Sequence, residues 1–342
     1  MANDEVPAIS CVFAPSLETS AHVAAAERLG YRRAWCYDSP ALCADPWMVL
    51  ALSAARTRRI GLGPAALVPS LRHPMVTAAA LATLSGLAPG RVSAAFGTGL
   101  TGRMLLGERP MRWAEVAEYV TAVRALLRGE EVGWNGSLLR MSQPAGFAAA
   151  RPVDAAVLIA ADGPRGAAVA AGIGDGTLSA RVPGKPDGRC QVVLTFGTIL
   201  EDGESAASPR AIGAAGPALV AAYHSIYESR GAAGVDGLPG GREWRAAVEA
   251  VDAPRRHFAI HDGHLIAPGA HDQALLAHAA PLLTKWTMTG AATQVRARLR
   301  ALSAAGVTEV AYQPMGPDIP RELTAFARAA GISAAGDGGE GA

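Results

Sequence analysis

Short apolar runs alternate with longer amphipathic segments along most of this chain. The runs are bounded by turn-forming residues, and the longer segments repeat their apolar positions with the period of a helix. This alternation is typical of repeated β–α units around a parallel sheet. The runs predict eight strands, at residues 8–14, 33–38, 60–68, 92–96, 154–161, 176–179, 191–196 and 309–313.

The segments between the strands predict helices at residues 20–30, 47–57, 74–86, 112–127, 164–171, 208–230 and 291–305. Eight β–α units close most simply into a (β/α)8 barrel, the TIM barrel, in which the chemistry lies at the carboxyl ends of the strands. We therefore expect an α/β protein with a single barrel domain over residues 1–332. Residues 333–342 are rich in Gly, Ala and acidic residues and predict a disordered tail.

Two segments interrupt this rhythm. The turn residues Gly133-Trp134-Asn135-Gly136 predict a hairpin outside the barrel. A long segment with helical periodicity, residues 201–290, separates the seventh and eighth strands. We expect it to cover the mouth of the barrel and to be the substrate-specific part of the protein.

Composition narrows the possible partners. Half of the 342 residues are hydrophobic, which allows a large core, and the formal net charge is only +1. Because a nucleic-acid-binding surface needs a basic patch, a small-molecule substrate is the expected partner. The chain begins without a signal-peptide pattern and holds no apolar run long enough to span a membrane. We therefore expect a cytoplasmic protein without membrane contact.

The cysteines argue against both disulfides and metal. Cys11, Cys36, Cys43 and Cys190 form no Cys-x-x-Cys pair, and no histidine stands at a zinc-ligand spacing from them. We expect reduced thiols and no metal site.

The third predicted strand has an unusual sequence, because Gly61, Gly63 and Pro64 interrupt its apolar residues. Proline removes a hydrogen-bond donor from a sheet, and glycine inside a strand marks a bulge or a close approach of another backbone. The fourth strand ends in Gly97-Thr98-Gly99, whose missing side chains leave room for a bulky ligand. A ligand is therefore expected beside this bulge.

Residues 97–102 also match the motif Gly-x-Gly-x-x-Gly, the fingerprint of dinucleotide-binding folds. That fingerprint requires a helix that starts inside it, whereas Gly107 and Pro110 interrupt the following turns and helical periodicity resumes only near Arg112. We favour the barrel over this alternative. In the barrel, Thr98 offers its hydroxyl or amide to the ligand.

A second glycine-containing turn follows the strand at residues 154–161 and opens a helix with a proline in its first turn. Free amides at the start of a helix favour an anion. An ordinary strand-to-helix turn is the alternative. The turn consists of Ala161, Asp162, Gly163, Pro164, Arg165 and Gly166.

Several motifs, in their order along the chain, resemble the signatures of the bacterial-luciferase-like flavin and deazaflavin enzymes. The resemblance runs from about Ile9 to Ala330 and is strongest to the coenzyme F420 branch typified by methylenetetrahydromethanopterin reductase. Besides the bulge, the Gly-Thr-Gly segment and the turn after residue 160, the motifs are Tyr37-Asp38-Ser39-Pro40, Asp45-Pro46-Trp47, Arg72-His73-Pro74 and His261-Asp262-Gly263-His264-Leu265.

The resemblance implies the positions that contact a cofactor. A cis peptide bond at Ala65-Ala66 would lie against the back of the cofactor ring, Thr98 and Gly99 would lie near the ring or its ribityl chain, and Asp38 would face the ring region. The phosphate would bind at the turn, with Arg165 as its charge partner. The residues implied at that turn are Ala161, Asp162, Gly163, Pro164 and Arg165.

Two positions depart from the family pattern. Many F420 relatives have histidine after the aspartate, where this chain has Ser39, and relatives that reduce a sugar lactol have glutamate where it has Leu100. The general acid therefore cannot be transferred by analogy. Asp38, Ser39 and His264 are our candidate catalytic residues. The candidate substrate contacts are Trp47, His261 and Trp286.

The favoured function is that of an F420-dependent oxidoreductase. It would transfer a hydride between the deazaflavin C5 and a small organic substrate, in the reduction of a C=C or C=N bond. The alternatives are a monooxygenase that uses reduced FMN and a barrel that binds flavin or F420 without turnover. Family members are usually dimers, so we expect a homodimer.

Overall fold

The computed structural model describes residues 5–182 and 188–333. They form two compact units. Among the described residues, the barrel unit comprises Ala8–Leu194 and Ala305–Ala311, and the helical unit comprises residues 5–7, Thr195–Ala304 and 312–333. The single domain predicted over residues 1–332 stays a prediction, and residues 334–342 of the expected tail lie outside the described residues.

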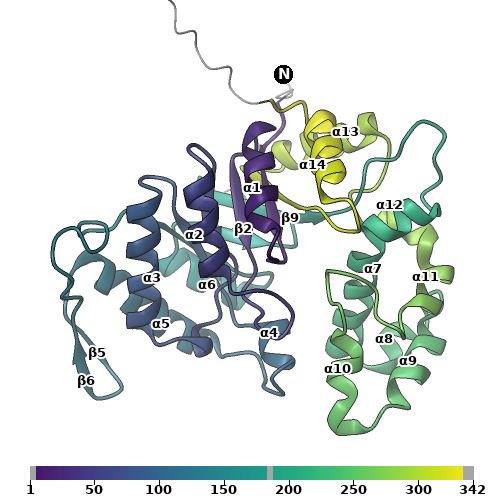
Figure 1. The fold of residues 1–342 in the computed structure, drawn as a ribbon. Coiled ribbons are helices and arrows are strands. Elements are labelled where there is room, and N and C mark those ends of the chain that lie inside the picture. Colours follow the sequence, from purple (N-terminus) through teal and green to yellow (C-terminus); the bar gives the residue numbers. More distant parts are fainter. Residues whose placement is uncertain (1–4, 183–187, 334–342) are drawn as a thin grey trace, which may run out of the picture. The chain divides into compact units, whose positions relative to one another are not determined.

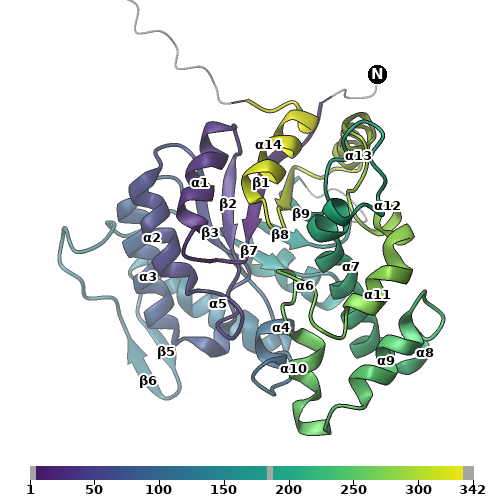
Figure 2. The ribbon, with the colours of Figure 1, turned by 45° about the vertical axis from the view of Figure 1, so that its right-hand side comes forward.

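All eight predicted strands are present and belong to one sheet, in the order β3-β2-β1-β10-β9-β8-β7-β4. The pairs β1–β2, β2–β3, β4–β7, β7–β8 and β8–β9 are parallel, and Val12 lies beside Trp35, for example. The sheet is drawn in Figures 1 and 2. The strands are β1 (Ala8–Phe13), β2 (Arg33–Cys36), β3 (Gly61–Pro64), β4 (Ser93–Phe96), β7 (Ala156–Ala160), β8 (Gly176–Ser179), β9 (Cys190–Phe196) and β10 (Glu309–Gln313).

The sheet closes into a barrel between its end strands, β3 and β4. Two isolated parallel bridges, Leu62 with Val92 and Leu67 with Phe96, join them. The strand predicted at residues 60–68 is shorter than expected, because only Gly61–Pro64 forms a regular strand. A Cβ atom on Gly63 would lie 2.2 Å from the carbonyl oxygen of Ser93, so the close approach of β4 requires glycine there.

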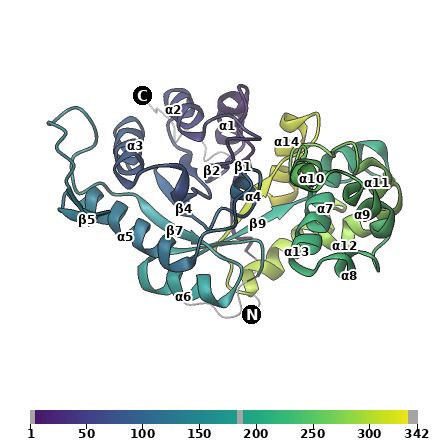
Figure 3. The same ribbon diagram turned by 90° about the horizontal axis from the view of Figure 1, so that it is seen from below.

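Helices cover the outside of the barrel unit, as Figure 3 shows for α1 to α3, α5 and α6. Several begin at the predicted signals: Asp45 accepts hydrogen bonds from the amides of Trp47 and Met48, and His73 Nδ1 accepts one from Met75. His73 thus caps a helix. These helices are α1 (Thr19–Arg28), α2 (Pro46–Arg56), α3 (Pro74–Leu87), α5 (Trp113–Arg128) and α6 (Pro164–Ile173).

Two smaller elements accompany the barrel unit. The predicted hairpin is confirmed as β5 (Val132–Trp134) and β6 (Ser137–Leu139). A five-residue helix, α4 (Leu100–Met104), lies where we expected no helix before Arg112. It is too short to show helical periodicity in the sequence.

The helical unit contains most of the long segment between β9 and β10, coloured green in Figure 2. Its core includes Leu219, Tyr223, Trp244 and Leu275. Within the described residues, no helix is both long and apolar enough to span a bilayer. The helices are α7 (Pro209–Arg230), α8 (Ala232–Val235), α9 (Gly241–Glu249), α10 (Arg256–His261), α11 (Gln273–Ala279), α12 (Leu283–Trp286), α13 (Ala292–Ala304) and α14 (Ile319–Ala330), with 3-10 turns at Pro69–Leu71, Ala253–Arg255 and Ala280–Leu282.

A buried carboxylate ties together the amino-terminal ends of the barrel strands. Glu309 begins β10, and its Oε1 accepts hydrogen bonds from Ser10 Oγ at 2.6 Å and from the Trp35 indole at 3.3 Å. Its Oε2 accepts one from Arg33 at 3.0 Å, and the Arg33 guanidinium also lies 4.9 Å from the Trp35 ring centre. In (β/α)8 barrels the chemistry lies at the opposite, carboxyl-terminal end of the strands, so this network serves stability.

We expect Glu309→Ala to lower the free energy of unfolding by about 3–5 kcal/mol, because it leaves the largely buried Arg33 and two buried donors unpaired. Urea denaturation of the full chain measures the change. The control, Glu130→Ala, breaks an exposed ion pair with Arg128 and should have little effect. Equal effects of the two variants would contradict the structural role of Glu309.

Candidate functional site

A cavity of about 390 Å³ lies at the carboxyl ends of the barrel strands. This is where (β/α)8 enzymes hold their ligands, and the volume is that of a small-molecule site. Its walls come from the ends of β2, β3, β4 and β7 and from the first residue of α5, while Val12, Leu178 and Leu194 form its floor. The polar and small residues at its rim are Tyr37, Asp38, Ser39, Ala65, Ala66, Gly97, Thr98, Gly99, Thr101, Gly102, Ala160 and Asp162.

One wall of the cavity is built from small residues. The peptide bond between Ala65 and Ala66 is cis, as the family resemblance implied. A Cβ atom on Gly97 would lie 3.3 Å from the Cβ atoms of both Ala66 and Ala160, so these three residues lie side by side. Because none of them projects a long side chain, a flat ring system can approach this wall closely.

Asp38 is the buried charge of the site, with an exposed fraction of only 2%. Its Oδ2 accepts hydrogen bonds from Arg72 at 2.7 Å and from the amide of Val68 at 3.3 Å. Its Oδ1 is also buried but has no hydrogen-bond partner. Because an unpaired buried acceptor is costly, this oxygen is ready for a donor on a ligand.

Arg72 holds this carboxylate in place from outside the cavity. Its other terminal nitrogen donates to Asp45 Oδ2 at 2.9 Å, so one guanidinium bridges two carboxylates. Burial lowers the pKa of Arg72, but its hydrogen bonds to Asp38 and Asp45 outweigh burial, and the net pKa is raised. Arg72 belongs to a motif that the sequence singled out, but its ion pair with Asp38, which follows the neighbouring strand β2, could not be read from the sequence.

Tyr37 is a second polar residue in the cavity that sequence reasoning left without a role. Burial raises the pKa of its phenol, so the hydroxyl stays protonated at neutral pH. Trp113, the first residue of α5, also lines the cavity. A tyrosine or a tryptophan gives no clear functional signal in a sequence, because aromatic side chains usually belong to the hydrophobic core.

The predicted phosphate turn follows β7, where a second cavity of about 380 Å³ is lined by Gly163, Pro164 and Arg181. Asp162 lines both cavities. Its Oδ1 accepts hydrogen bonds from Ser179 Oγ at 2.7 Å and the amide of Ala180 at 2.8 Å, which joins the ends of β7 and β8. Arg165, in contrast, is exposed and is not among the residues that line this cavity.

The remaining predicted residues lie apart from this constellation or in the other unit. Trp47 is in α2 and is not among the cavity-lining residues. His261, His264 and Trp286 belong to the helical unit, where Trp286 packs against Tyr223 with ring centres 5.7 Å apart. Burial, with smaller contributions from His224 and His261, lowers the pKa of His264 to about 3, so this imidazole is neutral at pH 7.

The four cysteines are free thiols, as expected. Cys11 and Cys36 are fully buried. Burial raises the pKa of Cys36 to about 12, which makes this thiol a poor nucleophile.

Fold and site together define a (β/α)8-barrel protein with a ligand cavity at the carboxyl ends of its strands. Residues 14–309 match the family described as luciferase-like monooxygenase, and the chain belongs to that family. The F420-dependent glucose-6-phosphate dehydrogenase of Nakamurella multipartita is 36% identical over 147 residues. That match covers 40% of this chain and 42% of the relative, so the chain spans less than half of the relative's length.

Two solved structures share the fold over nearly the whole chain. The coenzyme F420 dependent tetrahydromethanopterin reductase of Methanopyrus kandleri has a TM-score of 0.62 at 21% identity, over 95% of this chain and 98% of that one. The oxygenating constituent of 3,6-diketocamphane monooxygenase of Pseudomonas putida, in complex with FMN, has a TM-score of 0.58 at 13% identity, over 95% and 96%. At these identities the likeness shows the fold alone.

Proposed function

We propose that this protein is an F420-dependent oxidoreductase that transfers a hydride between the deazaflavin C5 and a small organic substrate, in the reduction of a C=C or C=N bond. The observation that carries the proposal is Asp38 Oδ1, a buried acceptor without a partner in a residue that lines the barrel cavity. The likeness to F420-dependent dehydrogenases supports the choice of cofactor.

The residues present fit a ring system of this kind. Ala66, Gly97 and Ala160 offer a flat wall, and Asp38 Oδ1 can accept a hydrogen bond from a ring N–H or a ribityl hydroxyl. When bound, F420 supplies the hydride chemistry, while the protein supplies position and electrostatics. Arg72 keeps the Asp38 carboxylate oriented, so that its second oxygen remains available.

The turn after β7 provides the anion site in this proposal. Gly163 precedes α6, Pro164 has no amide hydrogen, and the following amides of Arg165 and Gly166 are the first free donors of the helix. Asp162 positions the turn through its bonds to β8 and does not bind phosphate itself, because two anions repel. Arg165 acts here through its backbone amide.

Four residues with a hydroxyl group line the cavity, Tyr37, Ser39, Thr98 and Thr101. The catalytic residues predicted from the sequence, Asp38, Ser39 and His264, stay predictions, and Tyr37 is a further candidate source of the proton that accompanies the hydride. Trp47, His261 and Trp286 remain candidate substrate contacts. A homodimer and a cytoplasmic location are part of the same proposal.

A reduced-FMN monooxygenase is the second candidate, because one structural neighbour was solved with FMN. Flavin and deazaflavin share the three-ring plan, so the small-residue wall suits both. A barrel that binds either ring without turnover is the third candidate.

Cofactor titration separates these candidates. We expect F420 to quench protein fluorescence with a Kd in the micromolar range or lower, and FMN to bind at least tenfold more weakly. Reduced F420 bound to the protein should react slowly with oxygen in stopped flow. Tight binding of FMN without binding of F420 would contradict our proposal and favour the reduced-FMN monooxygenase. Binding of neither cofactor would refute the F420-dependent and the FMN-dependent function alike.

The role of Asp38 is tested by Asp38→Asn. The substitution preserves shape but removes the charged acceptor, so we expect F420 affinity to fall about tenfold or more, equivalent to about 1.4 kcal/mol. Asp45→Asn is the matched control, because Asp45 also binds Arg72 but lies outside the cavity, and asparagine caps a helix equally well. Unchanged affinity in Asp38→Asn, or equal losses in both variants, would refute the assigned role.

The anion site is tested by Gly163→Val. A Cβ atom on Gly163 meets no atom within 4 Å, and its backbone is extended, so the variant should fold normally. The added side chain occupies the approach to the helix amides and should weaken F420 binding about tenfold, while a phosphate-free deazaflavin should bind as before. Gly133→Val, which is equally unobstructed, is the control. Equal loss for both ligands would contradict a phosphate site at this turn.

A further inference from the structure

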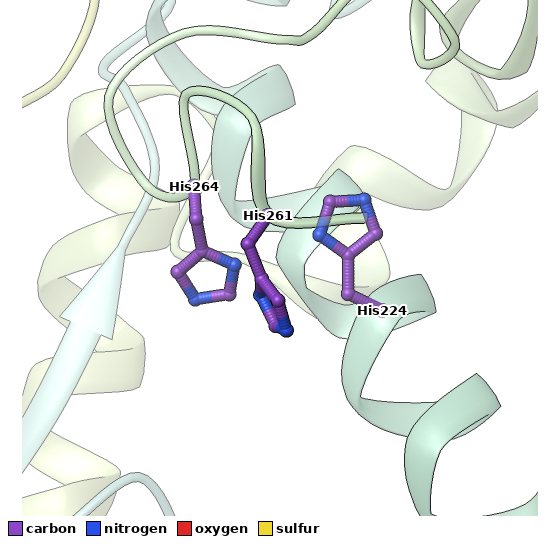
Figure 4. A group of neighbouring side chains, drawn as sticks. All are labelled: His224, His261 and His264. Atoms are coloured by element: carbon purple, nitrogen blue, oxygen red, sulfur yellow. The ribbon is translucent and has the colours of Figure 1, made fainter. Parts of the chain in front are cut away.

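Three histidines of the helical unit come together from two separate segments. His224 lies in the middle of α7, His261 is the last residue of α10, and His264 follows in the next turn. Figure 4 shows the three rings gathered around one point, with His224 on its helix and the other two on the turn. Sequence analysis predicted no metal site, because the cysteines form no Cys-x-x-Cys pair and no histidine stands at a zinc-ligand spacing from them, and it did not consider His224.

The rings are close enough to share one ion. Each residue has a ring nitrogen within 4.8 Å of a ring nitrogen of the other two. The ring centres are 5.4 Å apart for His261 and His264, and 5.8 and 6.1 Å from His224 to His264 and His261. His224 and His261 are almost completely buried, with exposed fractions of 0% and 1%.

Buried nitrogens in this cluster lack hydrogen-bond partners. His224 Nδ1 and both ring nitrogens of His261 are buried without one. Unpaired buried polar atoms are rare in folded proteins, since each loses its hydration without compensation. A cation at the centre of the cluster would take the one lone pair that each neutral imidazole offers, at Nδ1 of His224 and at one ring nitrogen of His261.

A carboxylate orients the His224 ring from behind. His224 Nε2 lies 3.1 Å from Asp272 Oδ1, so the Nε2 proton can be donated to Asp272, which leaves the Nδ1 lone pair for a ligand. Asp272 is itself fixed by the Trp244 indole at 2.9 Å and the amide of Gly269 at 2.8 Å. Such a carboxylate behind a histidine is the usual outer shell of a metal-binding imidazole.

A second carboxylate lies beside His261. Glu228 follows His224 by one helical turn on α7, and its Oε1 lies 2.6 Å from His261 Nε2. This close contact is not a hydrogen bond, and neither of the two buried atoms has another hydrogen-bond partner. Two ligand atoms of one ion would also lie this close, so Glu228 can complete a set of three nitrogens and one oxygen.

The turn that carries His261 and His264 is built by Gly263, which has a φ of +62°. A Cβ atom there would lie 2.2 Å from the carbonyl oxygen of Ala267, so the tight turn requires glycine. The amide of His264 donates to the carbonyl of His261 at 3.1 Å. This turn brings both histidines to the same side.

We propose that His224, His261 and His264 bind one divalent transition-metal ion of the zinc class, oriented by Asp272 and completed by Glu228 or water. Imidazole nitrogens with one carboxylate are an ordinary ligand set for Zn²⁺, with Zn–N distances of ~2.1 Å. The nitrogens would then be ~3.4 Å apart, which small side-chain rotations provide. The ion links α7 to the turn after α10, so it stabilises the helical unit. This inference is independent of the proposed cofactor, but it replaces the catalytic role predicted for His264 and the substrate contact predicted for His261 by metal binding.

The test uses full-length protein without a polyhistidine tag. We expect elemental analysis of the purified protein to find about one zinc per chain, and stripped protein to rebind one Zn²⁺ in a competition titration. Co²⁺ should give the visible absorption bands of a low-coordinate site. Removal of the metal with a chelator should lower Tm, and Zn²⁺ should restore it.

Variants connect these signals to the cluster. We expect His224→Gln, His261→Gln and His264→Gln each to weaken Zn²⁺ binding at least tenfold and to abolish the response of Tm to the chelator, and Asp272→Asn to weaken binding by 10- to 100-fold. His278→Gln, an exposed histidine on α11, is the control and should leave both signals unchanged. Circular dichroism identifies any variant that does not fold.

Three results would overturn the proposal. Wild-type protein that neither contains nor binds one equivalent of Zn²⁺ or Co²⁺ would show that the cluster is a network of packed histidines. Metal binding that survives in folded His224→Gln and His264→Gln would place the ion elsewhere. If a chelator lowers Tm equally in the wild type and in the folded cluster variants, the ion is also bound elsewhere.

Discussion

The closure of the barrel between β3 and β4 is the constraint on which the candidate site depends. The two strands meet through single bridges at Leu62 and Leu67, and the backbone between these residues leaves the regular ladder. That interval contains Pro64, which cannot donate a ladder hydrogen bond, and the cis peptide bond at Ala65-Ala66. The residues that fail to pair with β4 thus become the wall of the cavity, so closure of the fold and formation of the site are the same event.

The electrostatics of the cavity follow from one buried charge. A carboxylate buried to the extent of Asp38 needs a partner, and Arg72 supplies it without entering the cavity lining. Because the same guanidinium binds Asp45, which caps α2, the position of the carboxylate is coupled to the start of a helix. The arginine satisfies one oxygen of Asp38 only, which leaves the other for a ligand.

Local patterns predicted most of the fold, because strands and helices of sufficient length leave a periodic signal. All eight strands were predicted, and prolines and caps placed the starts of α2, α3 and α6 within one residue or so. The sequence predicted a bulge in the third strand but could not show that the regular strand ends at Pro64, because pairing with β4 is a long-range contact. Helix α4 was missed because five residues are too few for a period. The motif resemblance, in turn, identified the residues around the cavity but not the ion pair that orders them.

The two sites in this chain differ in the kind of polar atom that folding leaves without a hydrogen-bond partner. At Asp38 the unmet atom is a carboxylate oxygen, which needs a hydrogen-bond donor and therefore favours an organic molecule with N–H or O–H groups. At His224 and His261 the unmet atoms are imidazole nitrogens that lie close to one another, and the lone pair of a neutral imidazole favours a cation. Residue type alone does not separate these cases, since histidine and aspartate serve both. The distinction arises from which atom of each side chain the surrounding structure has already satisfied, as Asp272 does for Nε2 of His224 and Arg72 does for Oδ2 of Asp38.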